Sequence, residues 1–178
     1  TGRVDAIVDG GPCGVGVEST VLTLCTHPAR ILRPGAVTME MLRQVLPDIE
    51  MDPGVFAPMP EDSKAPSPGM KYKHYAPKAR VVLVKADREG FARFMAGKPS
   101  DAGAVCFDGD QDSLGCVCIP YGREDDPASQ AHEVFDALRQ VDKLGLQEAY
   151  IRIADEHGIG DAVYNRLLRA AGFEEIRI

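Results

Sequence analysis

Three short segments of the chain carry side chains that could bind an anion or transfer a proton. The first, residues 14–20 (GVGVEST), combines two glycines with the hydroxyls of Ser19 and Thr20. Glycines let backbone amides approach an anion, and hydroxyls add further donors. No lysine follows the glycines, so this is not a Walker-type phosphate loop. From the residues alone, a glycine-rich turn leading into a strand stays open as the alternative.

The second segment places Arg33 at the end of an apolar strand pattern, directly before Pro34 and Gly35. The proline restricts the backbone direction there, and a guanidinium is suited to bidentate contacts with phosphate or carboxylate. Strand ends that face a cleft commonly hold ligands. An exposed arginine at the end of a strand is the alternative interpretation of the same residues.

The third segment, residues 67–77 (SPGMKYKHYAP), is basic and aromatic. Residues 63–80 hold five Lys or Arg and no acidic residue, although the whole chain has a formal net charge of −7. Such a basic strip in an acidic protein predicts one anionic ligand at one place. His74 could act as a base or contact an anion, and Tyr72 and Tyr75 could stack or donate hydrogen bonds. A linker anchored by aromatic packing is the alternative.

The cysteines and the remaining acidic residues point to no metal site. The five cysteines form no CxxC pair and no Cys/His zinc spacing, which favours reduced, mostly buried thiols in a cytosolic protein. Cys13 lies in a Gly/Pro loop without an evident activating partner. The acidic run at 108–112 lacks the later bidentate glutamate of a calcium loop. Residues 158–160 (GIG) resemble an anion-binding helix start, but the adjacent Asp161 disfavours an anion, so a structural role is predicted.

Three stretches of chain position these residues. Residues 1–46 are predicted to form short strands at 4–8, 19–24 and 29–32, and a short helix capped by Thr38 with an apolar face of Met39, Leu42, Val45 and Leu46. Residues 47–79 form a linker, since residues 47–77 hold seven of the thirteen prolines. The first stretch has too few elements for an independent core, so it is expected to be the end of a longer domain.

Residues 80–178 alternate between strand and helix patterns. Strands are predicted at 81–84, 102–107, 116–119, 149–153 and 174–178, with helices at 87–97, from 127 to about 141, and at 160–171. Short connections between alternating elements predict a small Rossmann-like α/β domain with a parallel-rich sheet. This domain carries the whole acidic excess, which makes it a poor surface for a phosphate backbone.

The order of these segments resembles the two-domain form of the threonylcarbamoyl-AMP synthase family. The matching strings are VDGG at 8–11, ESTV at 18–21, LRPG at 32–35, SPGMKYKHYAP at 67–77 and GIGDAVYNRL at 158–167. The resemblance implies that residues 1–46 are the C-terminal portion of a YrdC-like α/β catalytic domain. It further implies that residues 47–79 are a linker and lid, and residues 80–178 the C-terminal α/β domain.

The resemblance also implies an activity and a set of site residues. Members of this family make threonylcarbamoyl-AMP and pyrophosphate from threonine, bicarbonate and ATP with Mg²⁺, and pass the product to tRNA modification in the cytoplasm. By this resemblance Ser19 contacts threonine, Arg33 contacts the phosphates, and Tyr75 lies near the nucleotide. Tyr72 and His74 belong to the lid.

The family also has Lys-x-Arg and Ser-x-Asn motifs that this chain lacks upstream of Asp9. Stabilising a reacting triphosphate needs several converging donors, so the chain is expected to be truncated and inactive by itself. A regulatory or ligand-binding module without catalysis is the alternative, and RNA binding has weak support. No apolar run approaches bilayer length, so no membrane association is expected.

Overall fold

The computed structural model of the chain describes residues 2–11, 13–60, 67, 76–154 and 157–178. Its largest part is a five-stranded sheet with the order β6-β5-β7-β4-β8, in which all neighbouring strands run parallel. The strands are β4 (Arg80–Lys85), β5 (Ala102–Cys106), β6 (Val117–Pro120), β7 (Glu148–Ile153) and β8 (Glu175–Arg177). The predicted α/β class with a parallel sheet is confirmed.

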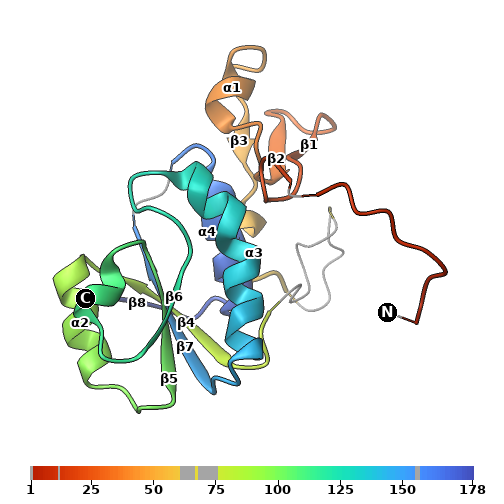
Figure 1. Cartoon of the computed structure of the whole chain (residues 1–178). Coiled ribbons are helices and arrows are strands. Elements are labelled where there is room, and N and C mark those ends of the chain that lie inside the picture. Colours follow the sequence, from red (N-terminus) through yellow and green to blue (C-terminus); the bar gives the residue numbers. More distant parts are fainter. Residues whose placement is uncertain (1, 12, 61–66, 68–75, 155–156) are drawn as a thin grey trace.

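Helices cover both faces of this sheet (Figure 1). They are α2 (Arg88–Ala96) on one face, and α3 (Pro127–Lys143) and α4 (Gly160–Ala170) on the other. The alternation of side chains along β4 serves both layers. Val82 and Val84 pack with the residues of α2, whereas Val81 and Leu83 join the core formed with α3 and α4.

The helix boundaries follow from local signals in the sequence. Asp87 caps α2 by accepting a hydrogen bond from the Gly90 amide at 2.6 Å, and Gly97 ends the helix. Asp126 caps α3, whose first residue is Pro127. The predicted apolar stripe of α3 is confirmed for its buried members, Ala131, Val134, Leu138 and Val141, and Phe135 packs half-buried beside them.

A smaller lobe precedes this domain and lies at the N-terminal end of α4 in Figure 1. It contains β1 (Val21–Thr23), β2 (Arg30–Arg33), α1 (Met39–Arg43), β3 (Glu50–Met51) and the 3-10 turn η1 (Pro53–Val55). β1 and β2 are antiparallel, and β2 and β3 are parallel. Because β2 lies in the middle of this sheet, Ile31 and Leu32 are its buried residues.

One prediction for this lobe is wrong, and another holds only in part. Residues 4–8 form no strand, and Val8 is 96% exposed, since no described strand lies beside them to complete a hydrogen-bonded pair. The helix α1 does begin after its predicted cap, Thr38, which accepts a hydrogen bond from the Met41 amide. However, α1 buries no residue, and Val45 beyond its end is 74% exposed. Of the predicted apolar face, Met39, Leu42 and Leu46 are half-buried and only Val45 is exposed, so the face is partly covered rather than part of a core.

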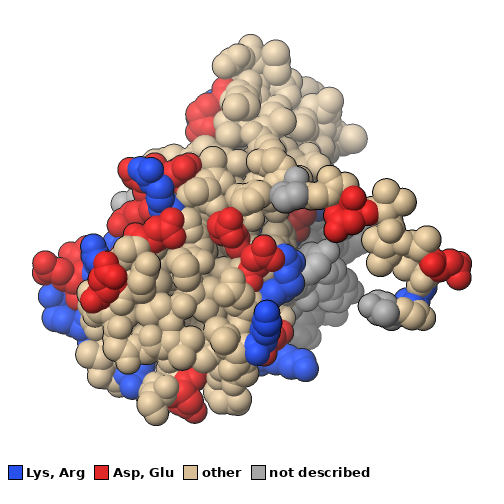
Figure 2. Space-filling view, viewed as in Figure 1, with Lys and Arg blue, Asp and Glu red and all other residues tan. Residues whose placement is uncertain are grey.

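The charge distribution differs between the two parts of the molecule. On the face shown in Figure 2, Lys, Arg, Asp and Glu are interspersed over the α/β domain, whereas the N-terminal lobe at the top shows few of them. The lobe exposes the apolar side chains of Leu24, Val37, Met41 and Val45. Among the described residues, no helix has the length and apolar character needed to span a membrane.

Candidate functional site

The structure brings two of the predicted site residues, Ser19 and Arg33, together in the N-terminal lobe. The Arg33 Nε donates a hydrogen bond to the Ser19 carbonyl at 2.9 Å. This contact arises because β1 and β2 pair so that Val21 faces Arg33, with an irregularity in register just after Val21. Residues 14 positions apart in the sequence thereby form one local site.

The backbone at this site is held by a close approach of two chain segments. A Cβ on Gly35 would lie 2.5 Å from the Thr20 amide nitrogen and 2.8 Å from the Ser19 carbonyl carbon, and closer still to the Glu18 carbonyl oxygen. Only glycine leaves room for this packing. The Thr20 hydroxyl donates to the carbonyl of Val37 at 2.7 Å, which ties the same two segments together.

The Ser19 hydroxyl and the terminal nitrogens of Arg33 suit an anionic or zwitterionic ligand. Ser19 is exposed, and no described residue makes a hydrogen bond with its hydroxyl. Arg33 uses its Nε for the Ser19 carbonyl, and neither terminal nitrogen of its guanidinium makes a hydrogen bond or ion pair with a described residue. The two residues in this contact thus offer a hydroxyl and a forked cation, groups that suit carboxylate or phosphate recognition.

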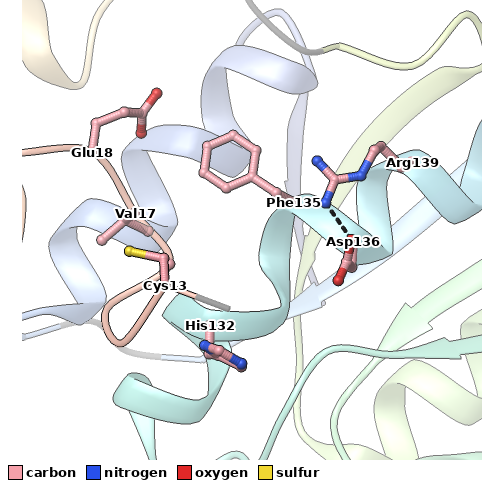
Figure 3. A pocket seen from close by; sticks show the side chains of 8 residues that line it. Cys13, Val17, Glu18, His132, Phe135, Asp136 and Arg139 are labelled. Carbon is pink, nitrogen blue, oxygen red and sulfur yellow. Dashed lines mark hydrogen bonds and ion pairs between the residues drawn. The ribbon is translucent and has the colours of Figure 1, made fainter. Parts of the chain in front are cut away.

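A cavity of about 520 Å³ lies next to this site, between residues 13–18 and α3 (Figure 3). It is lined by Cys13, Gly16, Val17, Glu18, His132, Phe135, Asp136 and Arg139. Gly16 has a φ of 84°, and a Cβ there would lie 2.5 Å from the Cα of His132. The loop therefore touches the backbone of α3 itself, which brings His132 into the cavity wall.

Glu18 connects this cavity to the buried surface of α4. It forms an ion pair with Arg166, whose guanidinium also lies 4.7 Å from the centre of the Phe135 ring. Burial, and secondly the nearby Arg169, lower the pKa of Arg166 to about 10. Arg166 therefore remains a cation at neutral pH. Nothing in the sequence indicates this pair, because Glu18 and Arg166 lie near opposite ends of the chain.

The structure shows backbone groups around Cys13 that activate its thiol, which the sequence did not indicate. Hydrogen bonds from the backbone amides of Gly16 and then Val15 lower the pKa of its thiol. Burial has the opposite effect elsewhere, since it raises the pKa of Cys106 to about 12 and that of Cys118 to about 11. Thiolates are the reactive form of cysteine, so the thiols should differ in reactivity.

We expect iodoacetamide at pH 7.5 to alkylate Cys13 first, at least ~10-fold faster than Cys106 and Cys118. Peptide mass spectrometry over a time course measures each rate. Cys25 is the matched control, since it is also exposed. Equal rates at Cys13 and Cys25 would show that the backbone amides do not activate Cys13.

The second prominent polar cluster lies at the carboxyl edge of the parallel sheet. Arg152, near the end of β7, is buried and binds both carboxylate oxygens of Asp110, at 2.9 and 3.0 Å. It also donates to Glu124 at 2.6 Å and to the Ala86 carbonyl at 3.1 Å. These partners lie in the loops after β5, β6 and β4. One side chain therefore joins the three connections that follow these strands, and its guanidinium is engaged by them.

Other groups considered from the sequence have structural surroundings. Asp161 lies in the first turn of α4, and its pKa is raised by burial and then by Glu40, so this helix start does not favour an anion. The Cys118 thiol lies 3.3 Å from the carbonyl of Cys116. Within the described part of the chain, no three His, Cys, Asp or Glu side chains are placed to hold a metal ion. Tyr72, His74 and Tyr75 lie outside the described residues.

The fold and this site define an α/β protein with a parallel five-stranded sheet, joined to a small lobe that carries a Ser–Arg pair. The sequence profile of a family described as "Threonylcarbamoyl-AMP synthase, C-terminal domain" matches residues 37–172. The chain belongs to this family.

Individual relatives agree with this assignment. The chain is 34% identical to the threonylcarbamoyl-AMP synthase of Pyrococcus abyssi and 34% identical to that of Bacillus subtilis, in each case over 99% of this chain. The alignments cover 52% and 51% of those proteins, so the chain spans about half the length of these curated relatives.

Two solved structures are also similar. The crystal structure of P. abyssi Sua5 complexed with L-threonine superposes with a TM-score of 0.82 and 33% identity, over 99% of this chain and 52% of that one. A structure of the H-to-A, Y-to-A double variant of the same protein superposes with a TM-score of 0.80 and 33% identity, over 96% and 49%.

Proposed function

We propose that the chain is part of a cytoplasmic threonylcarbamoyl-AMP synthase. The enzyme converts threonine, bicarbonate and ATP into threonylcarbamoyl-AMP and pyrophosphate, and the product serves the threonylcarbamoyladenosine modification of tRNA. The observation that carries this proposal is the hydrogen bond from the Arg33 Nε to the Ser19 carbonyl, which joins the residue that bears the hydroxyl to a guanidinium whose terminal nitrogens make no hydrogen bond or ion pair with a described residue. The similarity over 99% of the chain to a protein crystallised with L-threonine supports it.

In this proposal the two described site residues have separate roles. Ser19 donates from its hydroxyl to the threonine moiety, and Arg33 binds the phosphates of the nucleotide through its terminal nitrogens. Mg²⁺ enters with ATP as part of the substrate. The threonine carboxylate and the phosphates are both anionic and repel each other. The positive charge of Arg33, which contacts Ser19, reduces this repulsion when both substrates are bound.

The linker supplies the remaining roles. We assign residues 47–79 to a linker and lid between a catalytic portion at 1–46 and the α/β domain at 80–178; β3 and η1 at its start join the lobe, and the lid is the part that follows them. Tyr72 and His74 cover the site, and Tyr75 lies near the nucleotide. The chain contains one His-Tyr dipeptide, at residues 74–75. The replacement of a histidine and a tyrosine together in P. abyssi Sua5 supports a role for such a pair.

The chain by itself is proposed to lack turnover. Ser19 and Arg33 supply only two of the several converging donors that a reacting triphosphate requires. The exposed apolar side chains of Leu24 and Val45 support the view that the lobe packs against further parts of the synthase. Pyrophosphate release by this chain, given threonine, bicarbonate and Mg-ATP, should equal the blank. Turnover above the blank would contradict the proposal.

In the full-length synthase, replacing Arg33 by glutamine should lower pyrophosphate release by about 100-fold, because the phosphates lose a charged bidentate donor. A coupled pyrophosphate assay, run with and without threonine, measures this effect. The matched control is Arg93→Gln, which removes an exposed arginine of α2 and should leave the rate within about twofold. Equal rates for the two variants would refute the role of Arg33. A wild-type enzyme that releases no threonine-dependent pyrophosphate would refute the function itself.

A further inference from the structure

We propose that Arg166 of α4 is a positioning residue for the threonine site, acting through its ion pair with Glu18. This inference rests on the proposed function, and it assigns the α/β domain a part in substrate binding. Glu18 directly precedes Ser19 in the chain, so whatever fixes the Glu18 carboxylate also restrains the peptide that presents the Ser19 hydroxyl.

The polar face of α4 contacts the N-terminal lobe at two separate places. Asn165 donates to the carbonyl of Val55 at 2.6 Å, and Arg169 donates to the carbonyl of Gly54 at 2.8 Å. Both of these contacts hold η1, whereas the ion pair of Arg166 reaches Glu18, the residue before Ser19. All three side chains belong to buried residues. The helix therefore has one set of contacts that holds the lobe and one that reaches the site.

The guanidinium of Arg166 has a fixed position between the α/β domain and the N-terminal lobe. It lies over the ring of Phe135 on α3, 4.7 Å from the ring centre, and its side chain is 8% exposed. A cation held against an aromatic face has little freedom to follow a moving carboxylate. Glu18 is therefore drawn to a place set by α3 and α4, rather than by its own loop.

The end of β2 and the residues after it also hold the segment that carries Ser19. The Arg33 Nε donates to the Ser19 carbonyl at 2.9 Å, and Gly35 packs against the backbone of residues 18–20. Ser19 is thus linked to Arg33 of the lobe through its own carbonyl, and to Arg166 of the α/β domain through the neighbouring Glu18. Loss of Arg166 leaves the Arg33 contact in place but frees the carboxylate end, which lets the Ser19 hydroxyl move away from its binding geometry. Displacements of about 1 Å can cost large factors in rate or binding.

The kinetic test compares two buried arginines of the same helix in the full-length synthase. Arg166→Met should raise the KM for threonine about 10-fold with kcat within about twofold, because substrate binding is weakened without loss of chemistry. Arg169→Met removes hydrogen bonds to η1 and should lower the unfolding temperature while the KM stays within about twofold. Arg166→Lys keeps the charge and should recover part of the threonine affinity. An unchanged KM in Arg166→Met, or an equal rise in Arg169→Met, would overturn the proposal.

A second measurement on this chain is independent of activity. Hydrogen exchange should speed up at residues 17–21 in both Arg166→Met and Glu18→Gln, by about fivefold or more, with little change at residues 53–56. Arg169→Met should instead speed up exchange at residues 53–56, with little change at residues 17–21. Unchanged exchange at 17–21 would overturn the positioning role even in an active enzyme. If the wild-type synthase proves inactive with threonine, the proposed function fails, and the exchange pattern still decides whether Arg166 holds this segment.

Discussion

Replacing Arg152 by methionine is expected to lower the free energy of unfolding of the chain by about 3–5 kcal/mol. The Arg152 side chain is 2% exposed and that of Asp110 is 5% exposed, so the pair lies out of reach of water. Methionine fills much of the same volume but removes the buried cation that contacts both carboxylate oxygens of Asp110, which keeps the Phe107 amide at 3.2 Å and the half-exposed Arg88 at 3.7 Å. An uncompensated buried charge is far more costly than the loss of a surface ion pair.

Chemical denaturation followed by circular dichroism measures this change. The matched control is Arg123→Met, which breaks the 3.0 Å surface pair with Asp125 and should cost less than about 1 kcal/mol. Adding Asp110→Asn to the Arg152→Met variant removes the stranded charge and should recover part of the loss. If Arg152→Met and Arg123→Met cost the same, the buried pair contributes no more than a surface contact.

This network shows where prediction from the sequence ended. Capping residues, prolines and apolar periodicity are local signals, and they placed the helices and strands of the α/β domain within a few residues. Asp110, in contrast, appeared only as one member of an acidic run in a loop. Its role depends on Arg152, 42 residues away in the sequence, and on the strand order that brings the two together. Spacing along the chain carries no information on such a pair.

The candidate site shows the same division. Ser19 and Arg33 were predicted from their residue types and the family resemblance, and their contact across β1 and β2 emerged only with the fold. Glu18 lies in a glycine-rich segment, and the sequence suggested no function for it. Its ion pair with Arg166 on α4 became visible only in the structure. The wrong strand at residues 4–8 has a related cause, because an extended apolar pattern becomes a strand only beside a partner.

A single added carbon atom, a Cβ at Gly35, is expected to disturb the geometry of this site. Gly35→Ala is expected to cost about 3 kcal/mol of unfolding free energy, at the upper end for overpacking, since the three atoms nearest to the new Cβ are backbone atoms of residues 18–20. Flexible side chains could move aside, but the carbonyl of Glu18 and the amide of Thr20 belong to the segment that enters β1. The clash is relieved only by separating that segment from Gly35, which also displaces Ser19 from Arg33.

Gly115→Ala is the matched control, because a Cβ there meets nothing within 4 Å, and its cost should stay below about 0.5 kcal/mol. Denaturant titration of both variants measures the difference. Hydrogen exchange locates it, since only Gly35→Ala should speed exchange at residues 18–23. In the full-length synthase, Gly35→Ala should also raise the KM for threonine, because the Ser19 hydroxyl and the Arg33 guanidinium no longer converge. A stable Gly35→Ala variant with wild-type KM would show that the close approach of these two segments is not needed for the site.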